Sequence, residues 1–367
     1  MSKKLPMSEP FMTSWQWHAN LLSILSSYGQ TSSWIFSNYI HLFCEKDLTG
    51  HAYVDVLPMF PMQKCPWVDV QTISRKTLQN MKAGILELLI SSIDDGCYVY
   101  GMFDLKYIKR GENYARNKRI APHDLFISGY DAENEMFYVN DFIFDYKYSQ
   151  KTVPYHEIVE AYEKMDPDYD TLNEGKGGIQ LVSFNAAASY GLDAVLVKES
   201  LHEYLHSKNP TERNRASENP RDLAFGLEVY ASLAAFLESL KTEGKHMDSR
   251  PLHVLVDHKE MMIERIKFLD SNGFLRESEQ LLKLYQAILD EFLVIRNTFI
   301  KATIKGDRSL LDYIISKLDS IVSAEKEAVQ LFIDNLLEKQ EVTFVNNFNG
   351  KSLWWDGSAT ESAPAAL

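Results

Sequence analysis

Cysteine, glycine, proline and long apolar runs are all scarce in this sequence, and each shortage excludes a class of protein. The 367 residues include three cysteines, 17 glycines and 12 prolines. Three scattered cysteines are too few for a disulfide scaffold or a four-cysteine zinc site, and so little glycine and proline excludes a fibrous chain. No window approaches about 18 uninterrupted apolar residues, so we expect no membrane-spanning helix.

Targeting signals are also missing. The first fifteen residues, MSKKLPMSEPFMTSW, carry two lysines but no apolar core behind them, so they do not form a secretory signal. We therefore expect a soluble, cytoplasmic protein whose cysteines are reduced thiols.

Positive charge is outnumbered as well. The chain has 51 acidic and 38 basic side chains, a formal net charge of −13. A nucleic-acid partner is therefore not expected, because binding one requires a basic face that neutralises phosphates. Since 45% of the residues are hydrophobic, the chain is not largely disordered, and its length predicts two or three domains with cores of their own.

The pattern before residue 185 is that of an α+β domain with an antiparallel sheet, in which short strands alternate with a few helices. Helices are expected over Trp15–Tyr28, with Thr13 or Ser14 as N-cap, and over Leu78–Ile93. The expected strands are Cys97–Asp104, Asp124–Tyr130, Met136–Asp141 and Gln180–Phe184.

After residue 185 nearly every segment has a helical period, which predicts an α-helical bundle. The expected helices are Leu223–Lys241, Leu252–Leu269, Ser278–Lys305 and Ser309–Glu338. We therefore divide the chain into an α+β domain over residues 1–185, a helical domain over residues 186–345 and a flexible tail over residues 346–367.

The most informative stretch for chemistry is a predicted hairpin. His123 opens one strand and Asp141 ends the next, so the two side chains are expected to be neighbours at one edge of an antiparallel sheet. A carboxylate in that place fixes the imidazole tautomer and stabilises its cation, which is the His–Asp half of a nucleophilic triad. From spacing alone, an ordinary surface hairpin is an open alternative.

The same stretch resembles a known family, the N-terminal domain of butirosin biosynthesis protein H. The resemblance rests on the order of a strand ending in Asp, a basic loop, a His-led strand and a second strand ending in Asn-Asp. The matching residues are Gly96, Asp104, His123, Gly129, Tyr130, Asp131, Phe137, Tyr138, Val139, Asn140 and Asp141. Looser matches include Ala19–Leu22, Tyr28-Gly29, Phe225–Tyr230 and several residues between Leu252 and Arg265.

The resemblance implies a papain-like fold and acyl transfer. Members of this family are often encoded beside nonribosomal peptide and polyketide genes, which points to antibiotic or other specialised-metabolite biosynthesis. The protein that names the family moves an acyl group from a carrier-protein thioester to an amine. It follows that His123 is expected to act as the base and Asp141 to orient it. No intrinsic cofactor is expected, and the phosphopantetheine arm of a carrier protein would bring the substrate.

The family's cysteine nucleophile, at the start of the first helix, has no counterpart here. The sequence at that point runs from Thr13 to His18 without a cysteine, and three interpretations stay open. Ser14 can be the nucleophile, or a bound amine can attack the thioester directly, with His123 as base and Gln16 or backbone amides holding the oxyanion. In the third interpretation the protein has lost catalysis. His18 can assist in any of these or simply pack.

A basic loop leads into His123. It carries Lys106, Lys109, Arg110, Arg116, Lys118 and Arg119 with a single glutamate. Carrier proteins are acidic and their arm bears a phosphate, so this loop is a candidate docking surface. A solvated loop of scattered charges is the alternative.

The remaining motifs are weaker. Gly175–Gly178 lacks the spacing of a phosphate loop, and His202 and His206 lack a third metal ligand nearby, so no metal site is expected. Two alternatives stay open further along the chain: a helix face with His253, His258 and Arg265 that points at the site, or a pairing of Asp257 with Arg265 within the bundle. The preferred function is an acyltransferase or cyclising enzyme, with a carrier-binding accessory protein or a thioester or amide hydrolase as alternatives. The sequence leaves the oligomeric state open, and a homodimer is among the states that it allows.

Overall fold

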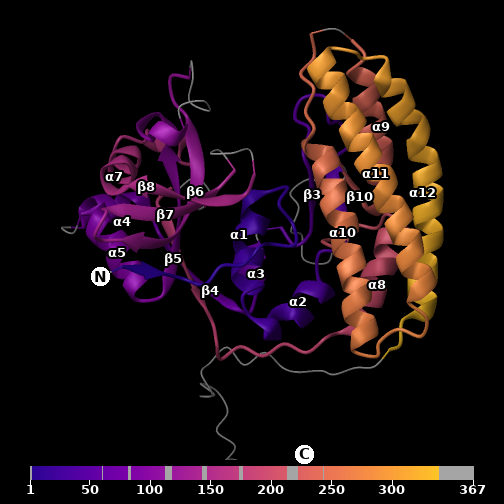
Figure 1. Ribbon diagram of the computed structural model, residues 1–367, viewed down its shortest axis with the longest axis horizontal. Helices are drawn as coiled ribbons and strands as arrows, with labels where there is room; N and C mark the ends of the chain where they lie inside the picture. The colour runs from indigo at the N-terminus through magenta and orange to yellow at the C-terminus, as the bar shows by residue number, and fades with distance from the viewer. Residues whose placement is uncertain are drawn as a thin grey trace, which may run out of the picture.

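A computed structural model provides the fold. It describes residues 2–59, 61–81, 84–111, 118–142, 147–172, 177–212, 222–242 and 244–338. The expected flexible tail over residues 346–367 lies outside these ranges, as does Arg116 of the basic loop. The architecture is mixed α+β, as the sequence predicts: a seven-stranded antiparallel sheet lies to one side and a bundle of long helices to the other (Figure 1).

The larger sheet has the strand order β4-β9-β5-β6-β7-β8, with β1 paired to β6. Its strands are β1 (Lys3–Lys4), β4 (Val68–Ile73), β5 (Cys97–Asp104), β6 (Pro122–Asp131), β7 (Met136–Asp141), β8 (Ser149–Pro154) and β9 (Ile179–Phe184). The predicted bounds of β5 and β7 are confirmed, and the strand expected from Asp124 extends two residues further toward its N-terminus and one residue beyond its C-terminus.

The hairpin of β6 and β7 places one end of both strands together. Phe126 is opposite Asn140 in the register, and continuing this antiparallel register puts Leu125 opposite Asp141. His123 is two residues before Leu125, and side chains two residues apart lie on the same face of a strand. His123 and Asp141 are therefore diagonal neighbours on one face of the sheet.

Helices α4 (Arg75–Asn80), α5 (Ile85–Asp94) and α7 (Tyr155–Glu163) lie along the sheet on the side away from the bundle (Figure 1). The single helix expected over Leu78–Ile93 is wrong. The backbone of Gly84 is extended, with φ −68° and ψ 157°, and α5 starts anew after it.

Three short helices lie between the sheet and the bundle (Figure 1). They are α1 (Gln16–Leu25), α2 (Ser32–Ser37) and α3 (Pro61–Lys64). The helix expected over Trp15–Tyr28 is confirmed in its core, but the expected cap is wrong: Trp15 is the N-cap and makes no side-chain capping bond. Thr13 and Ser14 are instead held from outside, because their backbone amides donate to the carboxylate of Asp257.

A second, three-stranded sheet joins distant parts of the chain. Its antiparallel order is β10-β2-β3, from β2 (Leu42–Glu45), β3 (Val54–Val56) and β10 (Leu223–Phe225). The helix expected from Leu223 is therefore wrong at its start. Leu223–Phe225 pair with β2, and the helix α9 begins only at Val229.

The long helices of the C-terminal part are α8 (Ala194–Leu205), α9 (Val229–Ser239), α10 (Arg250–Ser271), α11 (Glu279–Lys305) and α12 (Leu310–Asn335). The last three confirm the expected helices to within a few residues. One continuous hydrophobic core runs from the sheet into this bundle, and Phe36 of α2 stacks on Phe268 of α10 with ring centroids 4.9 Å apart. In the described ranges no helix is both long enough and apolar enough to cross a bilayer.

A buried polar network ties the bundle together. The ammonium group of Lys259 on α10 pairs with the carboxylate of Glu325 on α12, and both side chains are fully buried. Tyr204 and Tyr230 also donate their hydroxyls to Glu325. Removal from water lowers the pKa of Lys259, while the carboxylate opposes that effect. A buried charge pair of this kind is tolerated because each group has partners on several sides.

Candidate functional site

The two residues expected to form a catalytic pair do lie together. His123 Nδ1 is 3.4 Å from Oδ2 of Asp141, and 2.8 Å from the backbone carbonyl of Asp124. The imidazole side chain is 20% exposed, whereas Asp141 is fully buried. With its Nδ1 proton directed to these oxygens, the ring presents Nε2 as its reactive atom.

Two further side chains belong to this cluster. Nε2 of Gln16, at the first position of α1, donates to the carbonyl of Asp124 at 2.9 Å. The same carbonyl oxygen therefore accepts hydrogen bonds from both Gln16 and His123. The carboxylate of Asp124 lies 3.6 Å from His123 Nδ1 and accepts the hydroxyl of Tyr100. Gln16 is buried, and its Oε1 has no hydrogen-bond partner among the described residues.

The electrostatics favour a protonated His123. Its partial burial lowers the pKa of the imidazole, but the hydrogen bond and charge of Asp141, together with the charge of Asp124, outweigh that effect and raise it to about 9. At pH 7 only about 1% of such a group is neutral. His123 is therefore mainly an imidazolium at neutral pH, held between two carboxylates.

The hydroxyl proton of Ser14 is directed to Asp257 and not to His123. The hydroxyl and the backbone amide of Ser14 both donate to Oδ2 of Asp257, which also accepts the amide of Thr13 at 2.6 Å. Burial raises the pKa of Asp257, while these hydrogen bonds counteract the rise. A hydroxyl has one proton to donate, so the group positioned to receive the proton of Ser14 is Asp257.

His18 belongs to a different cluster. Its Nε2 lies 2.9 Å from Oδ1 of Asp55 in β3, and the imidazole is 1% exposed. Trp17 and Tyr53 donate to the other oxygen of the same carboxylate. A ring this deeply enclosed packs against the interior and does not reach a substrate.

The basic loop before His123 is exposed. Lys106, Lys109, Arg110, Lys118 and Arg119 all face solvent, and Lys106 Nζ donates to the carbonyl of Arg119 at 2.7 Å. Pro122, three residues after Arg119, begins β6, so the loop opens directly beside the His123 cluster.

None of the three cysteines has the lowered thiol pKa of a nucleophile. Burial raises the pKa of Cys44 to about 12 and raises that of Cys65 further, so both stay thiols at neutral pH. Cys97 lies in β5, where burial also raises its pKa. In the part of the chain that the structure describes, no three His, Cys, Asp or Glu side chains are grouped to hold a metal ion.

The pairing of Asp257 with Arg265, one of the two alternatives that the sequence leaves open, is not formed, because Asp257 accepts from Thr13 and Ser14 instead. Arg265 is fully buried and donates to the carbonyls of Phe36, Asn38 and Tyr39. Both α10 side chains thus hold backbone near the N-terminus. The sequence gives no signal for this, because the acceptors are carbonyl groups that every residue carries.

Two pockets lie away from the His123 cluster. One, of about 380 Å³, is bordered by segment 37–41, residues 57–59 and α8. The other, of about 250 Å³, is bordered by α4, α5 and α7. Neither is lined by His123, Asp141 or Gln16. The larger one contains His41 paired with Glu203, two residues that the sequence analysis missed because no motif links them.

No model of a protein family matches this chain, and a search of the curated proteins finds no significant match.

Proposed function

We propose that the protein transfers an acyl group from a carrier-bound thioester to an amine, or closes a ring by the same reaction. The proposal includes a papain-like arrangement of the α+β part, with the start of α1 facing the His123 strand. It is supported chiefly by one observation: Gln16 of α1 and His123 of β6 converge on the carbonyl of Asp124, while Asp141 of β7 lies against His123 Nδ1.

The reaction would proceed by direct attack. The amine nitrogen bonds to the thioester carbon and the carbon–sulfur bond breaks. The proton lost by nitrogen goes to the neutral form of His123, which is the minor form at pH 7 and the major form above about pH 9, and then to the departing thiolate. The amide group of Gln16 has two hydrogens and gives one to Asp124. Its second hydrogen is available to the oxyanion of the tetrahedral intermediate.

Direct attack is preferred over a Ser14 acyl-enzyme because of where the Ser14 proton points. The hydroxyl donates to Asp257, a residue whose carboxylate already accepts two backbone amides. Using Ser14 as a nucleophile would require breaking this anchor. His18, enclosed with Asp55, has no part in the proposed reaction.

The basic loop supplies the proposed contact with the carrier. Five exposed cations of the loop lie in the described residues, in a chain whose net charge is −13. An acidic carrier protein is repelled by most of this chain and attracted to this loop. The phosphate of the phosphopantetheine arm would bind there and place its thioester beside His123.

The test is acyl transfer followed by mass spectrometry. Short-chain acyl thioesters of pantetheine, free and loaded on an acidic carrier protein, are incubated with butylamine as the acceptor. We expect amide formation that falls about 100-fold or more in His123→Ala, since general base catalysis contributes about that much. His156, exposed on α7, provides the matched control His156→Ala, which should retain full activity. Equal turnover by His123→Ala contradicts the role of His123.

A non-catalytic accessory protein that binds a carrier is the second candidate. The observation that favours it is that His123 and Asp141 line neither of the two pockets. It predicts that an acidic carrier protein binds in a salt-sensitive manner while no thioester is consumed. Charge reversal at Lys109 and Arg110 would weaken such binding in both candidates, so turnover decides between them.

A further inference from the structure

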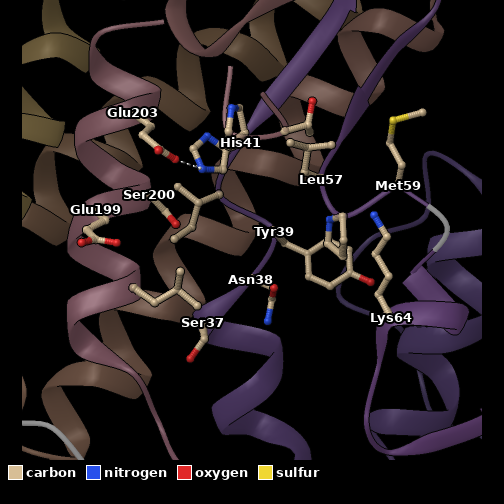
Figure 2. A pocket seen from close by; sticks show the side chains of 15 residues that line it. Ser37, Asn38, Tyr39, His41, Leu57, Met59, Lys64, Glu199, Ser200 and Glu203 are labelled. Atoms are coloured by element: carbon tan, nitrogen blue, oxygen red, sulfur yellow. Dashed lines mark ion pairs between the residues drawn. The ribbon is translucent and has the colours of Figure 1, made fainter. Parts of the chain in front are cut away.

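The larger pocket lies between the N-terminal segment and the helical bundle. Figure 2 shows Tyr39 and Asn38 on its floor, Glu199 and Glu203 of α8 on one side, and Lys64 of α3 on the other. Its volume of about 380 Å³ falls in the range of small-molecule sites.

The floor of this pocket is held rigidly from behind. Arg265 donates to the carbonyls of Phe36, Asn38 and Tyr39, and His258 Nε2 lies 2.8 Å from the carbonyl of Ile40. These contacts hold Tyr39 at φ 58°, a left-handed conformation that a bulky residue rarely adopts. Backbone kept in such a conformation by buried partners is a feature of binding and catalytic sites.

His41 lies in the wall of the pocket and pairs with Glu203. The residue is 7% exposed, and its Nε2 lies 3.4 Å from Oε2 of Glu203. Burial and the charge of Arg265 lower the pKa of His41 to about 4, so the ring is neutral at pH 7. With its proton on Nε2 toward Glu203, the lone pair is on Nδ1, which has no hydrogen-bond partner in the described part of the chain.

Opposite charges border the pocket on opposite sides. Glu199 and Glu203 are one helical turn apart on α8, and Lys64 stands across from them (Figure 2). Glu199 and Lys64 are exposed, and neither forms an ion pair with a described residue. Apolar side chains of Leu57, Met59 and others fill the wall between these charges.

We propose that this pocket binds a small zwitterion, with an ammonium group at the two glutamates and a carboxylate toward Lys64. An anion alone would face two carboxylates, and an amine alone would leave Lys64 without a counter-charge. The apolar wall suits a short hydrocarbon chain between the two ligand charges. The proposal is independent of acyl transfer, because it rests on a different set of residues.

The test is isothermal titration of the full chain with ω-amino acids of increasing length, from glycine through 4-aminobutyrate to 6-aminohexanoate. Butylamine and butyrate are the single-charge probes. We expect at least one ω-amino acid to bind with a stoichiometry of one and at least about tenfold more tightly than either single-charge probe, as expected for one charge-assisted contact.

The variants Glu199→Gln and Lys64→Gln should each weaken that binding about tenfold. Both residues are exposed, so the fold should persist, as checked by circular dichroism. The matched controls Glu327→Gln and Lys326→Gln, on the exposed face of α12, should leave binding unchanged. Absence of saturable binding by every ω-amino acid overturns the proposal, as does butylamine binding with equal affinity, or unaltered binding by Glu199→Gln and Lys64→Gln. Because no thioester is present, these outcomes are separate from the test of acyl transfer.

Discussion

The pairing of His123 with Asp141 makes a quantitative prediction about proton binding. The pKa of His123 is raised from an ordinary 6.5 to about 9, a difference that corresponds to about 3 kcal/mol of folding free energy. Because the folded state binds this proton more tightly than the unfolded state, the contribution is complete below pH 6.5. It is lost as the pH rises through about 9.

The substitution Asp141→Asn removes the largest effect that raises this pKa. Partial burial, which favours the neutral ring, is then opposed only by the charge of Asp124 and the hydrogen bond to its backbone carbonyl. We expect the pKa of His123 to fall by about 1 unit or more. The folding free energy of the variant should then depend much less on pH between 6.5 and 9 than that of the wild type.

The assay is NMR titration of the imidazole signals, with the His123 resonance assigned from its absence in His123→Gln, and urea unfolding at pH 6.5 and 9. Asp69→Asn, at an exposed position of β4, is the matched control and should leave the titration unchanged. A wild-type His123 that titrates near 6.5, or a pKa that Asp141→Asn does not lower, would show that Asp141 does not stabilise the imidazolium.

Two other predictions concern stability and are measured by urea unfolding. Lys259→Met leaves Glu325 charged and buried, and we expect the free energy of unfolding to fall by about 3–5 kcal/mol. The double variant Lys259→Met with Glu325→Leu should recover most of this loss. An equal loss in the single and the double variant would contradict the role of the buried ion pair. Gly178→Ala places a Cβ 2.0 Å from the carbonyl oxygen of Ile73 at φ 105°, so it should cost more than about 1 kcal/mol. Gly50→Ala, whose Cβ would meet nothing within 4 Å, should cost less, and a comparable loss would argue against the close approach.

Local signals explain which parts of the fold could be predicted. The bounds of β5 and β7 were predictable because turn residues precede each strand and β-type residues fill it. The hairpin between β6 and β7 then placed His123 beside Asp141 without further information. Leu223–Phe225 were wrongly predicted to be helical. They form a strand only because they pair with β2, which is distant in the sequence.

The contacts that arrange the rest of the site cannot be recognised from local patterns in the sequence. Ser14 is held by Asp257 and segment 36–40 by Arg265 and His258, which are separated from their partners by more than 200 residues. Backbone amides and carbonyls are common to all residues, so their use as partners cannot be seen in a pattern of side chains. The pocket with Lys64 and Glu199 is likewise assembled only when these segments meet.

The hydrogen bonds between α10 and the N-terminal backbone also determine when the N-terminal segment can complete its fold during translation. A ribosome releases residues 13–41 long before residues 250–271, so Asp257, His258 and Arg265 reach the solvent after the groups that they bind. β2 lacks β10 on one edge until Leu223–Phe225 have been made, and Tyr39 lacks the guanidinium that holds it until Arg265 follows. Segment 13–41 therefore stays incomplete during much of translation. A message truncated before β10 would encode a product in which β2 has an unpaired edge that invites aggregation.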